Sequence, residues 1–273
     1  MVATTTQVGD IARHVAGGRA AVRVLLRPGA DPHDYEPRPG DARDLAHARL
    51  VLRSGGDVDS WLGDLLRSAG HGARVVTVLD TVRRRGGDPH WWQDAENGIA
   101  GTRAVASALG RADPGGRAVY ARRARAYEDR LRSLDRAIAS CVARVPPAKR
   151  RLVTSHDALG YFAHRYGIEV IGTVIPSLSS QAQPSARDVE RLVRRIRRLR
   201  VEAIFPESSL NPKLERSLAR ETGVKVGGVL YADTLGPRGS RGSSYAGSLA
   251  VNAERIVRGI SGGRVRCRLP GRV

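Results

Sequence analysis

The segment that decides the fold is residues 113–147, DPGGRAVYARRARAYEDRLRSLDRAIASCVARVPP. The Asp-Pro pair at its start is typical of a helix N-terminus, and the Pro-Pro pair at its end would stop a helix. Between them, apolar residues recur at alternating spacings of four and three, which indicates one continuous seam along a helix. These residues are Tyr120, Ala124, Tyr127, Leu131, Leu134, Ile138 and Cys141. A helix of about thirty residues would be ~45 Å long, so we expect it to lie across two domains rather than to form a coiled coil.

Short β-branched runs alternate with helical patterns on both sides of this segment. VATTT and ARLVLRSG are examples before it, and RLVTS, IEVIGTVI and VEAIFPE are examples after it. This rhythm predicts an α/β fold in which helices cover parallel sheets. We therefore expect two Rossmann-like α/β lobes joined by one long backbone helix. The expected divisions are an N-terminal lobe over 1–112, the linking helix over 113–146, and a C-terminal lobe with a basic tail over 147–273.

The composition is that of a soluble globular protein with a large excess of positive charge. The chain has 273 residues, 41% of them hydrophobic, and no apolar run approaches the ~18 residues of a membrane span. Its net charge is +19, but 43 of its 46 basic residues are arginine, which is typical of a GC-rich coding bias. In VERLVRRIRRLR (189–200) the arginines face away from the apolar stripe, which favours a solvated helix face. Few aromatic residues accompany them, so a nucleic-acid surface is not indicated.

The cysteines and the start of the chain bear on the cellular compartment. Cys141 and Cys267 are the only cysteines, and the sequence leaves open whether they pair. Without a CxxC motif, any metal would have to be bound by histidine and carboxylate side chains. Met1 is followed at once by VATTT, which resembles a strand rather than a secretory leader. We expect either a cytosolic protein or one whose export leader is absent from this sequence.

Four dispersed residues share one kind of position. The loop PGADPHDYEPRPG (28–40) is too rich in proline and glycine for a helix or a central strand, and it contains His33. His90, His156 and Asp233 likewise come just after probable strands. Open α/β sheets place their ligand sites beyond the carboxyl ends of their strands. Imidazole and carboxylate are accepted zinc ligands, and imidazole-rich sites favour zinc over manganese.

Several blocks carry a resemblance to a known family. PGADPHDYEP, DPHWW, VTSHDALGYFAHRYGIEVIG, AQPSARDVERL, IFPESSLNPKLERSLARETG and LYADTLG resemble, in order, the blocks of the solute-binding proteins of bacterial zinc and manganese ABC importers. The resemblance covers about 2–262. It implies a metal held between two lobes, with ligands at His33, His90, His156 and Asp233. Manganese-selective relatives tend to have glutamate where His156 stands, so the resemblance implies zinc. A long His-rich loop found in many zinc receptors of this family has no counterpart here.

The resemblance implies an extracytoplasmic zinc receptor that is not an enzyme. Its partner would be a membrane ABC permease, and a metallochaperone is a second candidate partner. We expect a monomer that does not bind nucleic acid. Glu207 follows a strand and is a candidate to orient a ligating histidine. Three alternatives remain: a manganese receptor of the same family, a zinc-dependent hydrolase, and a basic nucleic-acid binder or surface adhesin. A set of four protein ligands argues against the hydrolase, because catalytic zinc keeps a position open for water.

The remaining histidines and tryptophans have simpler interpretations. We expect structural or solvated roles for four histidines, which are His14, His47, His71 and His164. The three tryptophans, Trp61, Trp91 and Trp92, are expected to line the metal cleft or fill the core. Asp157 is expected to begin the helix that follows it, where a negative charge opposes the helix dipole.

Overall fold

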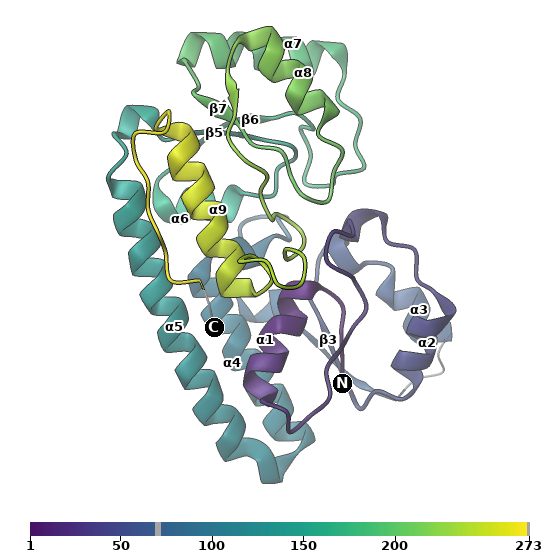
Figure 1. The fold of residues 1–273 in the computed structure, drawn as a ribbon. Helices are drawn as coiled ribbons and strands as arrows, with labels where there is room; N and C mark the ends of the chain where they lie inside the picture. The colour runs from purple at the N-terminus through teal and green to yellow at the C-terminus, as the bar shows by residue number, and fades with distance from the viewer. Residues whose placement is uncertain (69–71, 272–273) are drawn as a thin grey trace. The chain divides into compact units, whose positions relative to one another are not determined.

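The computed structural model describes residues 1–68 and 72–271, which form two compact units (Figure 1). The N-terminal unit is Met1–Ser133 and the C-terminal unit is Leu134–Val273. Each contains parallel strands covered by helices, so the predicted α/β class is confirmed. The predicted division at 112 and 146 stays a prediction. No helix in the described residues combines the length and apolar character that crossing a membrane requires.

The N-terminal unit is built on a four-stranded parallel sheet of order β2-β1-β3-β4. The strands are β1 (Val2–Ala3), β2 (Arg23–Val24), β3 (Leu50–Arg53) and β4 (Arg74–Thr77). Helices α1 (Thr6–Ala16) and α4 (Ala95–Ala112) pack on each other and on β3. Helices α2 (Pro39–Ala46) and α3 (Leu62–Ser68) bury Leu45 and Leu62 against Val2 and Val51. Successive residues of a strand thus point toward the helices on opposite faces of the sheet, as a sheet covered on both faces requires.

The C-terminal unit contains two short parallel pairs that adjoin. β5 (Arg151–Thr154) pairs with β6 (Glu169–Thr173), and β7 (Ala203–Ile204) pairs with β8 (Lys225–Val226). A parallel bridge between Thr154 and Phe205 joins the pairs. Helices α7 (Ala186–Leu199) and α8 (Lys213–Thr222) enclose one apolar cluster with these strands. Helices α6 (Gly160–Tyr166) and α9 (Tyr245–Ile260) contact β6 and β5 respectively. Because β5 and β7 are adjacent and parallel, the segments that follow them leave at the same edge.

The long helix predicted from residues 113–147 is present as α5 (Arg117–Ala143), 27 residues long. A short 3-10 turn over Pro114–Gly116 precedes it. The boundary between the two units falls inside it, after Ser133. All seven residues of the predicted seam are buried, which confirms the helical period. Near its end, Cys141 forms a disulfide with Cys267, with the two Cα atoms 6.1 Å apart.

Two sequence-based expectations about local structure are wrong. The loop over 28–40 contains a 3-10 turn at Pro32–Asp34, and α2 already begins at Pro39. Proline suits the first position of a helix because the N–H it lacks would have no partner there. Asp157 does not begin a helix: α6 starts at Gly160, and the backbone N–H of Asp157 donates to the Ser177 carbonyl at 2.9 Å.

Candidate metal centre

His33 is held in the N-terminal unit by two aspartates. Its backbone N–H donates to the Asp31 carboxylate at 3.0 Å, and its ring Nδ1 lies 3.5 Å from Asp57 Oδ2. The His33 side chain is only 2% exposed, whereas that of Asp57 is 49% exposed. Burial alone would raise the pKa of Asp57, but the hydrogen bond and charge of His33 outweigh burial, so this pKa lies below its ordinary value. The loop therefore buries an imidazole whose Nδ1 already faces a carboxylate.

His90 is held in the same way by a single aspartate. Asp88 Oδ1 accepts from the His90 backbone N–H at 2.9 Å and lies 2.7 Å from His90 Nδ1. The His90 side chain is fully buried, and its ring lies against the edge of Trp92. The His33 and His90 ring centroids are 5.6 Å apart, and the two residues offer ligand nitrogens within 4.8 Å of each other. Within the N-terminal unit, two imidazoles thus converge.

Both of these histidines belong to the same tripeptide, Asp-Pro-His, at residues 31–33 and 88–90. In each copy the aspartate accepts a hydrogen bond from the backbone two residues on, a turn that aspartate favours. The proline between them fixes its own φ angle and brings no N–H to compete for the carboxylate. The repeated tripeptide was a signal in the sequence that could have identified Asp31 and Asp88. For Asp57 no such local signal exists.

A buried carboxylate organises the loops behind these histidines. Asp59 is fully buried and accepts hydrogen bonds from Thr4 Oγ1 at 2.7 Å and the Ser54 backbone N–H at 2.6 Å. The Ser54 hydroxyl in turn accepts from the indole N–H of Trp91 at 3.0 Å. The ends of β1 and β3 are therefore tied to the turn that carries Asp57 and to the residue next to His90. Sequence reasoning had not identified Asp59.

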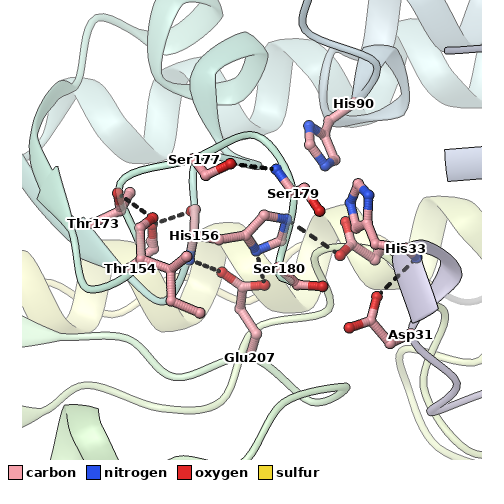
Figure 2. A network of polar contacts seen from close by, with 12 residues as sticks. Asp31, His33, His90, Thr154, His156, Thr173, Ser177, Ser179, Ser180 and Glu207 are labelled. Atoms are coloured by element: carbon pink, nitrogen blue, oxygen red, sulfur yellow. Dashed lines mark hydrogen bonds and ion pairs between the residues drawn. The ribbon is translucent and has the colours of Figure 1, made fainter. Parts of the chain in front are cut away.

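In the C-terminal unit, His156 follows β5 and is held by Glu207, which follows β7. Glu207 accepts from the His156 backbone N–H at 3.0 Å, and its other oxygen lies 2.7 Å from His156 Nδ1. Figure 2 shows the Glu207 carboxylate pointing at the ring and at the backbone of His156. Both side chains are fully buried. The two residues are 51 positions apart in sequence, and the adjacent strands β5 and β7 bring them together.

Asp233 completes this cluster in the C-terminal unit. It is fully buried, and its Oδ2 lies 3.3 Å from His156 Nε2. Two ligands of one tetrahedral zinc ion, each about 2.0–2.1 Å from the metal, are separated by about 3.4 Å. The spacing of these two atoms therefore fits adjacent ligands of one ion.

The two ring nitrogens of each of the three histidines have different surroundings. In each, Nδ1 faces a carboxylate, at 2.7 Å in His90 and His156 and at 3.5 Å in His33. A carboxylate at Nδ1 favours the tautomer that carries its proton there, because the N–H can donate to it. Nε2 then keeps a lone pair for a metal, and the carboxylate raises the basicity of the imidazole ligand. Each unit therefore presents imidazole oriented for metal binding.

The other predicted residues lie elsewhere in the two units. His14 bonds to Asp10 and stacks on Tyr127, whereas His47 and His164 are exposed. His71 lies outside the described residues. Trp91 and Trp92 are buried, and Trp61 packs against Tyr35 with ring centroids 4.7 Å apart. These placements agree with structural or solvated roles for the three described histidines.

This fold and these clusters are those of metal-binding substrate receptors of ABC importers. The chain belongs to the family described as zinc-uptake complex component A, periplasmic, whose model matches residues 1–259. Proteins of this family are substrate-binding components of transporters and not enzymes, as predicted; nothing supports the hydrolase alternative. They work with a membrane permease and an ATPase.

The relatives include binders of both metals. The zinc-binding protein TroA of Treponema pallidum is 31% identical over 94% of this chain and 87% of its own length. The manganese-binding lipoprotein MntA of Bacillus subtilis is 30% identical over 95% of this chain and 89% of its own length. The solved structure of the T. pallidum periplasmic protein TroA has a TM-score of 0.89 to this chain and covers 95% of it and 98% of itself, at 30% identity. Membership of the family is thus compatible with either zinc or manganese as the bound metal.

Proposed function

We propose that this chain is an extracytoplasmic zinc receptor that binds one Zn²⁺ ion. His33 and His90 would supply two imidazole ligands from the N-terminal unit. His156 and Asp233 would supply an imidazole and a carboxylate from the C-terminal unit. The observation that carries this proposal is the carboxylate at Nδ1 of every one of these histidines, because it favours the tautomer whose lone pair is on Nε2, the form that binds a metal.

Zinc is favoured over manganese by the type of ligand atoms. Imidazole nitrogen suits zinc and the later transition metals, whereas manganese prefers oxygen. The proposed set has three nitrogens and one carboxylate, which meets the coordination number of a closed tetrahedral zinc site. The similarity to a manganese-binding lipoprotein makes manganese the competing cargo.

The proposed compartment is the periplasm or the outer surface of the cytoplasmic membrane. The Cys141–Cys267 disulfide supports it, since structural disulfides persist in oxidising compartments and are rare in the cytosol. Relatives named as lipoproteins or periplasmic proteins support it as well. We propose that the chain acts as a monomer and passes its ion to a membrane permease. A metallochaperone is a further candidate partner, and nucleic acid is not expected to be one.

The test is a metal competition on protein stripped of metal and then offered equal concentrations of Zn²⁺ and Mn²⁺. Native mass spectrometry with elemental analysis should find one retained zinc per chain. His156→Glu exchanges an imidazole nitrogen for a carboxylate oxygen and should shift the preference toward Mn²⁺. His164→Glu makes the same chemical change on the exposed side of α6 and should leave the preference unchanged.

Each result has a defined consequence. One manganese per wild-type chain under competition would replace zinc as the cargo and keep the receptor function. No stoichiometric metal, or equal loss of zinc in the His156→Glu and His164→Glu variants, would overturn the assignment of these ligands.

A further inference from the structure

Charge is divided unequally between the two units. The N-terminal unit has 21 basic and 16 acidic residues, a net charge of +5, whereas the C-terminal unit has 25 and 11, a net charge of +14. Four of these eleven acidic residues are buried, namely Asp135, Glu207, Glu215 and Asp233. The excess on the C-terminal unit thus reflects both fewer acidic residues, 11 against 16, and more basic residues, 25 against 21, than in the N-terminal unit.

The positive charge is densest on α7. This helix buries Leu192, Val193 and Ile196 against the strands, so its remaining faces point to solvent. Those faces and the C-cap carry seven exposed arginines, which are Arg187, Arg191, Arg194, Arg195, Arg197, Arg198 and Arg200. Only two acidic residues, Asp188 and Glu190, lie on the same helix. We call this set of seven arginines the α7 arginine face.

Much of this charge is not neutralised within the protein. Arg191 pairs with Asp188 and Arg194 pairs with Glu190, while Arg197 donates to the Glu221 carbonyl at 2.8 Å. The other four arginines of the face form no ion pair with any residue in 1–68 or 72–271; they are Arg187, Arg195, Arg198 and Arg200. A solvated surface normally interleaves both signs of charge. Here guanidinium groups that can bind phosphate with two hydrogen bonds each remain available.

The arginine side chains also border an open hollow on the surface. Its volume is about 490 Å³, and its lining residues are Arg191, Arg194, Arg195, Arg197 and Arg198. The arginine side chains line this hollow mainly with their apolar stems, and their guanidinium charges make its surroundings favourable to anions. Phosphate oxygens are the acceptors that match the planar fork of arginine.

Exposed apolar side chains lie on the neighbouring elements. Figure 1 shows α7 and α8 side by side in the C-terminal unit. Leu214 on α8 is 48% exposed, and Val226 and Val229, on β8 and just after it, are 46% and 41% exposed. They lie close in sequence to the exposed Lys213 and Lys225. Basic residues combined with apolar ones suit the boundary between lipid headgroups and acyl chains. Nucleic acid would instead call for stacking aromatics, and α7 has none.

We propose that the α7 arginine face is an electrostatic docking surface for anionic phospholipid headgroups. Docking would concentrate the receptor in the plane where a membrane permease lies; this purpose rests on the proposed function, whereas the binding itself does not. Attraction to a charged surface acts within about one Debye length, so binding should weaken as salt is added.

The test is co-sedimentation of the full chain with two kinds of vesicle. Phosphatidylcholine vesicles containing about 30% phosphatidylglycerol should bind the protein, and pure phosphatidylcholine vesicles should not. The triple variant Arg187→Gln/Arg195→Gln/Arg198→Gln should lower the partition coefficient roughly fivefold for each arginine, or ~100-fold in total. The matched control Arg122→Gln/Arg125→Gln/Arg136→Gln removes the same charge from exposed positions of α5 and should lose far less.

The outcomes separate this proposal from its competitors. Equal losses in the two triple variants would show that net charge matters and not the α7 arginine face. Binding of a DNA duplex without binding of phosphatidylglycerol vesicles would assign the face to nucleic acid. Both triple variants should retain zinc at the wild-type stoichiometry. His33→Ala should lose zinc but keep vesicle binding, so failure of the metal site and failure of the membrane site are distinguishable.

Discussion

The two units hold their histidines by different means. In the N-terminal unit an aspartate two residues before each histidine accepts from the histidine backbone N–H, in both Asp-Pro-His copies, although Nδ1 of His33 faces the more distant Asp57. In the C-terminal unit the supporting Glu207 is 51 residues after His156, and a disulfide closes a separation of 126 residues. The first arrangement is set by local backbone geometry, while the second exists only once β5 and β7 are adjacent. The C-terminal histidine should therefore be the more sensitive to loss of its carboxylate.

Glu207→Ala should lower the free energy of unfolding more than any other change considered below. This change leaves two buried donors of His156, its backbone N–H and its Nδ1–H, without their acceptor. At about 1–3 kcal/mol for each of the two unpaired buried groups, the free energy of unfolding should fall by about 2–6 kcal/mol. Chemical denaturation of the metal-free protein measures it. Glu221→Ala, which truncates an exposed glutamate at the end of α8, is the control and should change stability by less than ~0.5 kcal/mol.

Removal of the disulfide should be nearly as costly. The Cys141→Ser/Cys267→Ser variant frees the C-terminal tail from α5 and restores chain entropy to the unfolded state. The expected loss is about 2–4 kcal/mol in the free energy of unfolding. Thermal unfolding of the variant should match that of the reduced wild type and lie below that of the oxidised wild type. An unchanged midpoint on reduction would contradict a stabilising role for this bond.

Asp88→Asn tests the local arrangement with a smaller change. Asparagine keeps an oxygen for the His90 backbone N–H but removes the charge beside Nδ1. Zinc affinity should fall by about tenfold, the lower end of the range for partners of metal ligands. The stability of the metal-free protein should change by less than ~1 kcal/mol. Competition titration with a zinc indicator measures the first quantity, and Glu207→Gln is the matched change in the C-terminal unit. A stability loss as large as that of Glu207→Ala would remove the distinction between the units.

The same contrast explains how much could be predicted from sequence. The βα rhythm and the apolar seam from Tyr120 to Cys141 are periodic and local, and both predicted their elements correctly. Glu207 could be named as a candidate partner of a histidine because residues that follow neighbouring parallel strands meet at one edge of the sheet. Asp57 and Asp59 were not found, because their contacts depend on how a turn after β3 folds back.

The errors have equally specific causes. Helix α2 is not predicted by the proline content of 28–40, because proline disfavours the interior of a helix, whereas Pro39 occupies the first helical position, where proline is favoured. The pairing of Cys141 with Cys267 could not be predicted, because the distance between these two residues depends on the tertiary fold. The charge asymmetry between the units was in the sequence, but it has meaning only once the unit boundary and the exposed face of α7 are known.

A weaker contribution to stability comes from another local contact of the N-terminal unit, between His14 and Asp10 on α1. Burial alone would lower the pKa of His14, but the hydrogen bond and charge of Asp10 outweigh it, so this pKa lies above its ordinary value. A raised pKa in the folded state means that the stabilisation is complete below the unfolded value and is lost as pH rises through the folded value. Between about pH 5 and pH 8 the free energy of unfolding of the wild type should therefore fall by about 0.5 kcal/mol more than that of His14→Gln. Denaturation at both pH values measures it, with His164→Gln at an exposed position of α6 as the control. An unchanged pH dependence in His14→Gln would show that Asp10 does not hold the imidazolium, and that the stacking of His14 on Tyr127, with ring centroids 4.4 Å apart, is what this contact contributes.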